Sequence, residues 1–305
     1  MTPTASCRVA NVFLILISYN MKCNYIMKRY FLMGMVGVAA IVISAPACAR
    51  PRGKADPTNA LKSMYTPDYL ALKKRILDQF KNPKPGRFGE FVKGAKKDMD
   101  TQQKVIALTF DACGGRHSGY NAKLIEYLRQ EKIPATLFVS GLWIERNKEV
   151  FKELAKDPLF EIENHGLLHR TCSINGSSMY GVIPTRSMGD VIDEMELNAR
   201  KIEEMTGRRP VFFRSAAAYC DEASIKVAQH LSMEVVSYDI LAGDAMHSSI
   251  RTMTHNIVTG ARHGAVVIMH FNHPEWHELE ALQAAVPALR VKGYTFGKLE
   301  DFSVK

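Results

Sequence analysis

The stretch Val105-Ile106-Ala107-Leu108-Thr109-Phe110-Asp111 predicts how the chain folds and where its chemistry lies. It is an apolar run that ends on a carboxylate, and Ala112-Cys113-Gly114-Gly115 follows at once. A short apolar run bounded by glycines is typical of a buried strand. Asp111 then places a charge at the end of a rigid element, a position that serves chemistry. A turn or helix-cap role is the alternative for a single Asp after a strand.

The pattern of an apolar run followed by an amphipathic stretch repeats along the rest of the chain. The predicted strands are 104–111, 135–139, 160–163, 211–213, 234–238, 265–270 and 294–296. The predicted helices are 118–130, 143–155, 188–205, 222–231, 249–261 and 278–290. This alternation indicates an α/β protein whose parallel sheet is closed or nearly closed into a barrel. An open doubly wound sheet is the alternative, but no Gly-x-Gly-x-x-Gly follows the first strand, so a dinucleotide site is not expected.

The chain of 305 residues has a net charge of +9, and the excess is unevenly placed. Residues 104–305 carry 23 basic and 25 acidic groups, whereas 50–103 carry 13 and 6, and 1–49 carry 4 and none. A basic N-terminal arm suits an anionic membrane surface or cell-envelope polymer better than nucleic acid. We therefore expect a leader at 1–49, a basic linker with one helix at 50–103, and a folded domain at 104–305.

Residues 1–49 predict export. A pair of basic residues precedes the apolar run 31–43, and Ala47-Cys48-Ala49 supplies a small-residue cleavage site. The run is shorter than the roughly 20 residues that span a bilayer. We expect cleavage after position 49, a natural start at Met21 or Met27, and a periplasmic or extracellular protein. An uncleaved membrane anchor is the alternative.

Export would place the chain where disulfides form. Cys113, Cys172 and Cys220 remain after cleavage. One disulfide with one free thiol is one prediction, and three small buried side chains are the other. Cys113 also has the position of a nucleophile beside two glycines, but no Gly-Cys elbow supports that role.

Polar side chains recur directly after the predicted strands. They are Asp111, His165, Arg214, Asp239 and His270. The carboxyl ends of the strands of a βα barrel meet at one edge, where active sites lie. We therefore expect these side chains to share one site.

His165 and His169 stand four residues apart in Glu163-Asn164-His165-Gly166-Leu167-Leu168-His169. On a helical turn this spacing places two imidazoles on one face, where they can chelate one cation. The Glu that lies between the histidines of zinc proteases is absent, so a metalloprotease is disfavoured. Two histidines that cap a helix or pack in a core are the alternative.

At this point five segments, in this order, resemble the motifs of the NodB-homology polysaccharide deacetylases of carbohydrate esterase family 4. They are Thr109-Phe110-Asp111, Asn164-His165 through His169, Phe213-Arg214 with Tyr219, Tyr238-Asp239, and Ile268-Met269-His270. The resemblance covers roughly 104–301. It implies a distorted (β/α)7-type barrel, a divalent metal, usually Zn²⁺, and hydrolysis of N-acetyl groups on an amino-sugar polymer.

The roles implied by this resemblance agree with the chemistry of amide hydrolysis, which needs an activated water, a Lewis acid and a proton donor. Asp111 is expected to be the general base, and His165 and His169 to hold the metal. His270 is expected to be the general acid, oriented by Asp239.

Three further side chains are expected to support this site. Arg214 would hold Asp111 through a charge-assisted pair. Tyr219, or backbone amides near it, would stabilise the oxyanion, although residues 215–218 lengthen the family's spacing there. Trp276 would stack on a sugar ring, with a partly buried loop position as its alternative.

The first motif departs from the family's pattern at Ala112, where the family has a second Asp that binds the metal. Catalytic zinc normally has three protein ligands, so the two histidines need another. Asp221 is the candidate, and Asp244, His117 and the nearby cysteines are alternatives. The other role for Asp221 is the N-cap of the helix predicted to begin at position 222.

These observations predict an exported hydrolase that deacetylates peptidoglycan, a chitin-like chain or an exopolysaccharide. Its partner is expected to be an acetylated polysaccharide rather than a nucleic acid. Ala112 suggests an alternative, a catalytically silent barrel that binds glycans. A related barrel hydrolase of a small amide is a third hypothesis.

Overall fold

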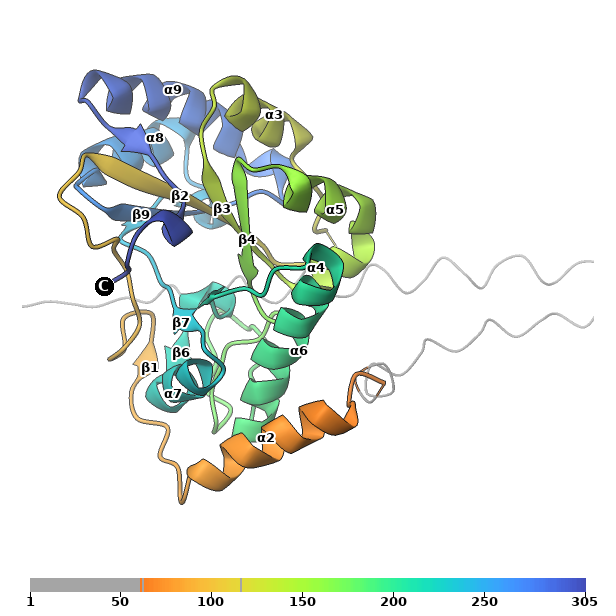
Figure 1. The fold of residues 1–305 in the computed structure, drawn as a ribbon. Helices are drawn as coiled ribbons and strands as arrows, with labels where there is room; N and C mark the ends of the chain where they lie inside the picture. Colours follow the sequence, from red (N-terminus) through yellow and green to blue (C-terminus); the bar gives the residue numbers. More distant parts are fainter. Residues whose placement is uncertain (1–60, 62, 116) are drawn as a thin grey trace, which may run out of the picture. The chain divides into compact units, whose positions relative to one another are not determined.

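The computed structural model of the chain describes residues 61, 63–115 and 117–305. In these ranges a curled sheet of parallel strands is wrapped by helices, as Figure 1 shows. This arrangement confirms the predicted α/β barrel. The predicted leader at 1–49 lies outside the described residues.

Five strands form the centre of the sheet and follow the predicted ranges closely. In spatial order they are β5 (Phe212–Phe213), β4 (Phe160–Asn164), β3 (Ala135–Val139), β2 (Val105–Ala112) and β9 (Ala265–His270). A further strand, β10 (Thr295–Phe296), pairs with the start of β2. All these pairs are parallel, so the carboxyl ends of the strands meet at one edge.

A single segment, 234–241, pairs with both ends of this array. Its first part, β7 (Glu234–Val235), pairs with β5, and its last part, β8 (Ile240–Leu241), pairs with β9. The single strand predicted at 234–238 is therefore wrong, because the chain leaves one neighbour and joins another. By bridging the two outer strands of the array, the segment closes the sheet toward a barrel.

Helices cover the outside of the sheet, and they match the predicted ranges within two residues, except the one predicted over 118–130, which begins later, and the one predicted over 143–155. They are α3 (Ala122–Gln130), α4 (Gly141–Arg146), α5 (Lys148–Lys156), α6 (Met188–Thr206), α7 (Glu222–His230), α8 (Ile250–Gly260) and α9 (Glu278–Val291). The helix predicted over 143–155 is two helices, because Asn147 leaves helical geometry, with φ −126° and ψ 38°. The long α6 ends at Gly207 in the left-handed conformation, as its sequence predicts.

Side chains along β2 alternate between two environments, as a pleated strand requires. The even-numbered residues pack with the outer helices; they are Ile106, Leu108, Phe110 and Ala112. Val105 and Ala107 belong instead to the inner core of the barrel. Thr109 and Asp111 continue this inner row, and both are buried. The alternation therefore directs Asp111 toward the inside of the barrel at its open edge.

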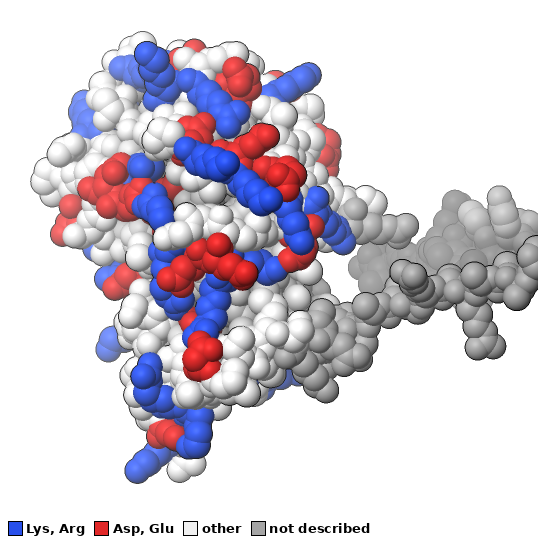
Figure 2. Space-filling view, turned by 45° about the vertical axis from the view of Figure 1, so that its right-hand side comes forward, with Lys and Arg blue, Asp and Glu red and all other residues white. Residues whose placement is uncertain are grey.

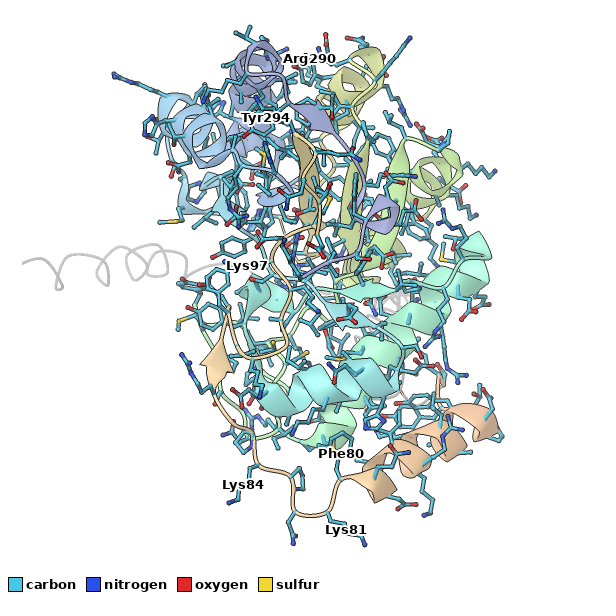
Figure 3. All side chains as sticks on the ribbon, turned by 60° about the vertical axis from the view of Figure 1, so that its left-hand side comes forward. Phe80, Lys81, Lys84, Lys97, Arg290 and Tyr294 are labelled. Carbon is cyan, nitrogen blue, oxygen red and sulfur yellow. The ribbon has the colours of Figure 1, made fainter. Side chains whose placement is uncertain are left out.

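The described part of the predicted linker packs against the domain. The helix α2 (Pro67–Gln79) begins with Thr66 as its cap, and its Tyr69 and Lys73 side chains bind Asp193 on α6. After α2, Phe80 packs against His230 with 5.2 Å between ring centroids, while Lys81 and Lys84 project outward (Figure 3). The chain then adds β1 (Phe88–Gly89) to β6 (Cys220–Asp221) in an antiparallel pair.

Acidic and basic side chains are interspersed on the face seen in Figure 2. This mixture agrees with the near balance of charges counted over 104–305. Within the described ranges, each helix is too short or too polar to cross a lipid bilayer.

Candidate active site

Four of the five polar residues predicted at the strand ends converge at the carboxyl edge of the sheet. Asp111 lies near the end of β2, His165 directly follows β4, Arg214 directly follows β5, and His270 ends β9. β2 pairs with β9 so that Asp111 and His270 stand side by side. The expected common location follows from the parallel order of the strands.

Arg214 is fully buried and holds the Asp111 carboxylate. Its Nη1 donates to Asp111 Oδ1 at 2.8 Å and to Thr109 Oγ1 at 2.9 Å. Its other nitrogens donate to the carbonyl oxygens of Val236 and Ser237 at 3.2 and 2.7 Å. Because the guanidinium is bound on several sides, it fixes the position of the carboxylate.

Cys113, His165 and His169 form a cluster of potential metal ligands. One donor atom from each lies within 4.8 Å of the others. The His165 Nε2 atom lies 3.7 Å from Cys113 Sγ and 3.7 Å from Asp111 Oδ2. His165 Nδ1 lies 2.9 Å from the Arg214 carbonyl oxygen, which can only accept a hydrogen bond. Nδ1 therefore carries a proton, so Nε2 is the ring nitrogen of His165 that can bind a cation.

This donor set fits a divalent cation, because a thiolate and two imidazoles are ligands that Zn²⁺ favours. Burial alone would raise the pKa of the Cys113 thiol, but the imidazoles of His169, His270 and His165 lower it well below its ordinary value. The surroundings thus favour the thiolate, which is the form that binds metals.

Asp221 lies outside this cluster, so its prediction as the third ligand is wrong. Its carboxylate caps α7, accepting from Ser224 N at 2.8 Å, and also accepts from Ile174 N at 2.7 Å. Cys113, one of the nearby cysteines given as alternatives, lies in the cluster instead. Two residues after Asp111 on an extended chain, a side chain returns to the same side of the strand.

The loop between the two histidines is not the helical turn that their spacing suggested. Gly166 has φ +82° and His169 has φ +53°, and these left-handed residues fold the segment into a tight bend. A side chain at Gly166 would collide with Glu194. The imidazole rings of His165 and His169 nevertheless meet, with 4.8 Å between their centroids.

Glu194 on α6 holds this loop, and sequence analysis missed it. Its carboxylate accepts from the backbone N–H groups of Leu168 and Arg170, both at 3.0 Å, on either side of His169. Burial raises the pKa of Glu194 to about 6. In the sequence Glu194 is one of several helix positions of α6. Only its contact with the loop identifies it as the residue that supports His169.

Asp244, and not Asp239, is the carboxylate that orients His270. Asp244 Oδ2 accepts from the His270 backbone N–H at 2.6 Å and lies 3.0 Å from His270 Nδ1. Asp239 instead pairs with Arg262 at 2.6 Å, so the predicted Asp239–His270 couple is wrong. Burial alone would lower the pKa of His270, but Asp244 and then Cys113 outweigh it and raise the pKa well above its ordinary value.

The two predicted substrate-contacting residues follow different strands of the sheet, Tyr219 after β5 and Trp276 after β9. Tyr219 follows a turn in which Ala217 and Ala218 have φ +57° and +58°, and its carbonyl accepts from Ser215 Oγ at 2.6 Å. Trp276 lies beside His270, with 5.3 Å between ring centroids, but His273 stacks on it at 3.9 Å. Part of the Trp276 face is therefore covered by protein.

Cys113, Cys172 and Cys220 are all free thiols. Cys172 and Cys220 are buried and face each other across a β-bridge, whereas Cys113 lies at the site. The prediction of small buried side chains thus holds for Cys172 and Cys220 and fails for Cys113, which is partly exposed.

A model of the polysaccharide deacetylase family matches residues 98–236. Over this range the chain is similar to the polysaccharide deacetylase family. The peptidoglycan-N-acetylglucosamine deacetylase of Bacillus cereus is 26% identical to it over 202 residues, which are 65% of this chain and 88% of that protein.

Solved structures of this family share the fold. The Bc1960 peptidoglycan N-acetylglucosamine deacetylase is 22% identical, with a TM-score of 0.58 over 68% of this chain and 91% of that chain. BA3943 of Bacillus anthracis, a family 4 pseudoenzyme, is 20% identical, with a TM-score of 0.56 over 66% of this chain and 65% of that chain. Since these likenesses show the fold alone, the chemistry of this chain rests on its own residues.

Those residues place a carboxylate and an imidazole next to a cluster able to hold a cation. Asp111 can accept a proton and His270 can donate one, as hydrolysis of an acyl group requires. Ala112 occupies the position where the family's motif has its second Asp, and its side chain packs in the outer core. In this chain Cys113 lies beside the two histidines instead.

Proposed function

We propose that the chain is a metal-dependent hydrolase that removes N-acetyl groups from an amino-sugar polysaccharide of the cell envelope or extracellular matrix. Cys113, His165 and His169 hold the divalent cation, for which Zn²⁺ suits the donor set. The observation that carries the proposal is the set of three ligand side chains beside the Asp111 carboxylate. Replacement of a carboxylate ligand by a thiolate keeps the ligand count of a catalytic zinc site.

The bound cation would supply Lewis-acid polarisation of the acetyl carbonyl and a more acidic water. Asp111, fixed by Arg214, accepts the proton of the attacking water. His270, oriented by Asp244, donates a proton to the departing sugar amine. Asp244 also stabilises the imidazolium form from which that proton comes.

The substrate class is supported by the family and by the expected export. The relative from Bacillus cereus is named for N-acetylglucosamine of peptidoglycan. The basic arm and leader at 1–103 suit a protein that works at an envelope, in the periplasm or outside the cell, with membrane association through its N-terminal segment. An acetylated polymer in that compartment is the substrate we propose.

Acetate release tests this proposal. The zinc-loaded protein should release acetate from N-acetylglucosamine oligomers or peptidoglycan, lose this activity with a chelator, and regain it with Zn²⁺. Asp111→Asn should lower kcat by about a hundredfold or more, because it removes the base. Failure of the folded, zinc-loaded protein to deacetylate any acetylated glycan would favour the silent glycan-binding barrel.

A second function, thiol-based acyl transfer, is favoured by the contacts of Cys113. Its thiol interacts with His270, which Asp244 orients, so the three resemble a nucleophile, a base and an orienting carboxylate. The thiolate would attack the acetyl carbon and form a thioester, His270 would protonate the leaving amine, and water would then release acetate.

Cys113→Asp separates the two mechanisms. An Asp can bind the cation but cannot form a thioester, so the metal mechanism predicts that this variant keeps zinc and part of its activity. The thiol mechanism predicts complete loss of activity and, in the wild type, an acetyl adduct on Cys113 detectable by mass spectrometry.

A further inference from the structure

Several aromatic side chains near the site lie outside the three large hydrophobic cores. They are Phe88, Phe91, Tyr180, Tyr219 and Tyr238. Phe91 is 53% exposed and Tyr180 is 75% exposed. Exposed rings gathered in one place are a common feature of surfaces that bind a ligand or partner.

Ring contacts join these residues in two sets, and we call the two sets together the aromatic platform. Phe88 and Tyr180 lie 5.5 and 6.0 Å from Tyr219 between ring centroids. Phe91 lies 5.3 Å from Tyr238, whose hydroxyl donates to Glu90 Oε1 at 2.7 Å. The platform thus combines apolar ring faces with hydroxyl and carboxylate groups. A sugar has matching groups, since its ring can stack on an aromatic face and its hydroxyls can form hydrogen bonds.

The platform reaches the candidate active site through a small cluster around Tyr238. Tyr238 clusters with Ala218 and Ile268, and Ile268 lies two residues before His270, on the same face of β9. Tyr219 directly follows Ala218, a member of this cluster. A ligand that extends outward from the catalytic residues would therefore reach these rings.

Part of the platform comes from outside the region that the family model matches. Phe88, Glu90 and Phe91 precede residue 98, where the match begins. The pairing of Phe88 with Asp221 and of Gly89 with Cys220 fixes this segment against β6, which Figure 1 shows beside β1. The N-terminal segment thus adds its own side chains to the catalytic face.

We propose that the aromatic platform binds the sugar units next to the one being deacetylated, so that the chain prefers an oligosaccharide over a single sugar. The proposal rests on the proposed function for its choice of a glycan. A glycan is favoured over a protein partner because the rings alternate with polar groups and continue the site where an acetylated sugar would react.

Oligosaccharide binding tests this proposal without turnover. The full chain carrying Asp111→Asn should be titrated with N-acetylglucosamine and with its tetramer, with and without Phe91→Ala and Tyr180→Ala together. Both side chains are exposed, so the fold should survive their removal. Removing two rings on which sugars stack should weaken tetramer binding by about tenfold and leave the single sugar unchanged. Val291→Ala, which removes an apolar side chain that is 90% exposed elsewhere, is the matched control.

Equal tetramer affinity in the double variant and the control would overturn the platform, and so would a wild type that binds no oligosaccharide. If sedimentation shows that the wild type is a dimer and the double variant a monomer, the rings would instead contact a second copy of the chain. If the tetramer binds through these rings but the zinc-loaded wild-type chain releases no acetate from it, the proposed deacetylase function would be refuted and the platform would stand.

Discussion

Cys113 stands two residues after Asp111, and on an extended chain this separation returns its side chain to the same side of the sheet. Ala112 faces the opposite way, into the outer core, where a small apolar side chain packs against the helices. A carboxylate there would be buried among apolar side chains. The family's motif has its metal-binding Asp at the position of Ala112. In this chain the potential ligand is the thiolate one residue later, at Cys113.

Cys113→Ala should abolish metal binding and activity together. With only His165 and His169 left, the site has fewer protein ligands than catalytic zinc requires. We expect bound zinc, measured by elemental analysis, to fall well below one ion per chain, and kcat to fall by about a hundredfold or more. Cys220→Ala is the control, because Cys220 is buried outside the cluster. Full zinc occupancy in Cys113→Ala would refute the ligand assignment.

Asp244→Asn and Asp239→Asn should differ sharply in activity. Asp244 binds His270, whereas Asp239 pairs with Arg262. An amide at position 244 no longer stabilises the imidazolium form, so kcat should fall by about a hundredfold, the scale of general acid catalysis. The variant at 239 should remain within about threefold of the wild type. Equal losses in steady-state kinetics would show that Asp244 does not orient the acid.

At the scale of the element, the loop that carries His169 depends on α6. A bend with left-handed residues has no regular hydrogen-bond pattern of its own, so its N–H groups need acceptors from elsewhere. Glu194 supplies them from the helix. Asn198, also on α6, donates to Asn164 Oδ1, which accepts from Gly166 N as well. The geometry of the metal cluster is therefore set partly by a helix that contributes no ligand.

Glu194→Ala should weaken zinc binding by about 10- to 100-fold, the usual effect of losing a group that orients a ligand. Glu194→Gln should restore most of the affinity, because an amide oxygen can still accept both backbone N–H groups. Competition with a chelating dye measures these affinities. The control is Glu203→Ala, at an exposed position of the same helix. A Glu194→Ala variant with unchanged zinc affinity would show that the loop holds its shape without the helix.

At the scale of the whole molecule, two buried carboxyl groups line the barrel. Glu161 accepts from Thr136 at 2.6 Å, and Glu163 accepts from the Phe212 backbone at 2.7 Å. Burial raises the pKa of Glu161 to about 7, and burial with the nearby Glu161 charge raises the pKa of Glu163 well above its ordinary value. Between about pH 4.5 and 7 the folded chain thus binds more protons at these groups than the unfolded chain does.

Stability should therefore fall as the pH rises through this window, because the state that binds more protons is disfavoured when protons become scarce. Glu161→Gln removes one of these groups and should lessen the fall. We expect the variant to gain stability relative to the wild type between pH 5 and pH 8, by on the order of 3 kcal/mol at most. Urea unfolding at both pH values measures the difference. Glu149→Gln, at an exposed position, should show no such trend, and a difference independent of pH would contradict the shift.

The sequence by itself determined the order of strands and helices, the parallel sheet and most of the polar residues at its carboxyl edge. These follow from local periodicity and from the rule that parallel strands end together. Asp111 and Arg214 also meet as the motifs suggested. These properties depend on short stretches of chain, in which the spacing of apolar residues and the order of the motifs can be read directly.

Only the tertiary structure decided which carboxylate holds His270, which residue completes the ligand cluster and what supports the loop to His169. Asp239 and Asp244 both follow the strand predicted at 234–238, but Asp239 pairs with Arg262 whereas Asp244 binds His270. Asp221 caps α7, and Glu194 reaches from α6 to the loop that carries His169. Such assignments depend on which distant groups come within hydrogen-bond reach, and local sequence does not encode that distance.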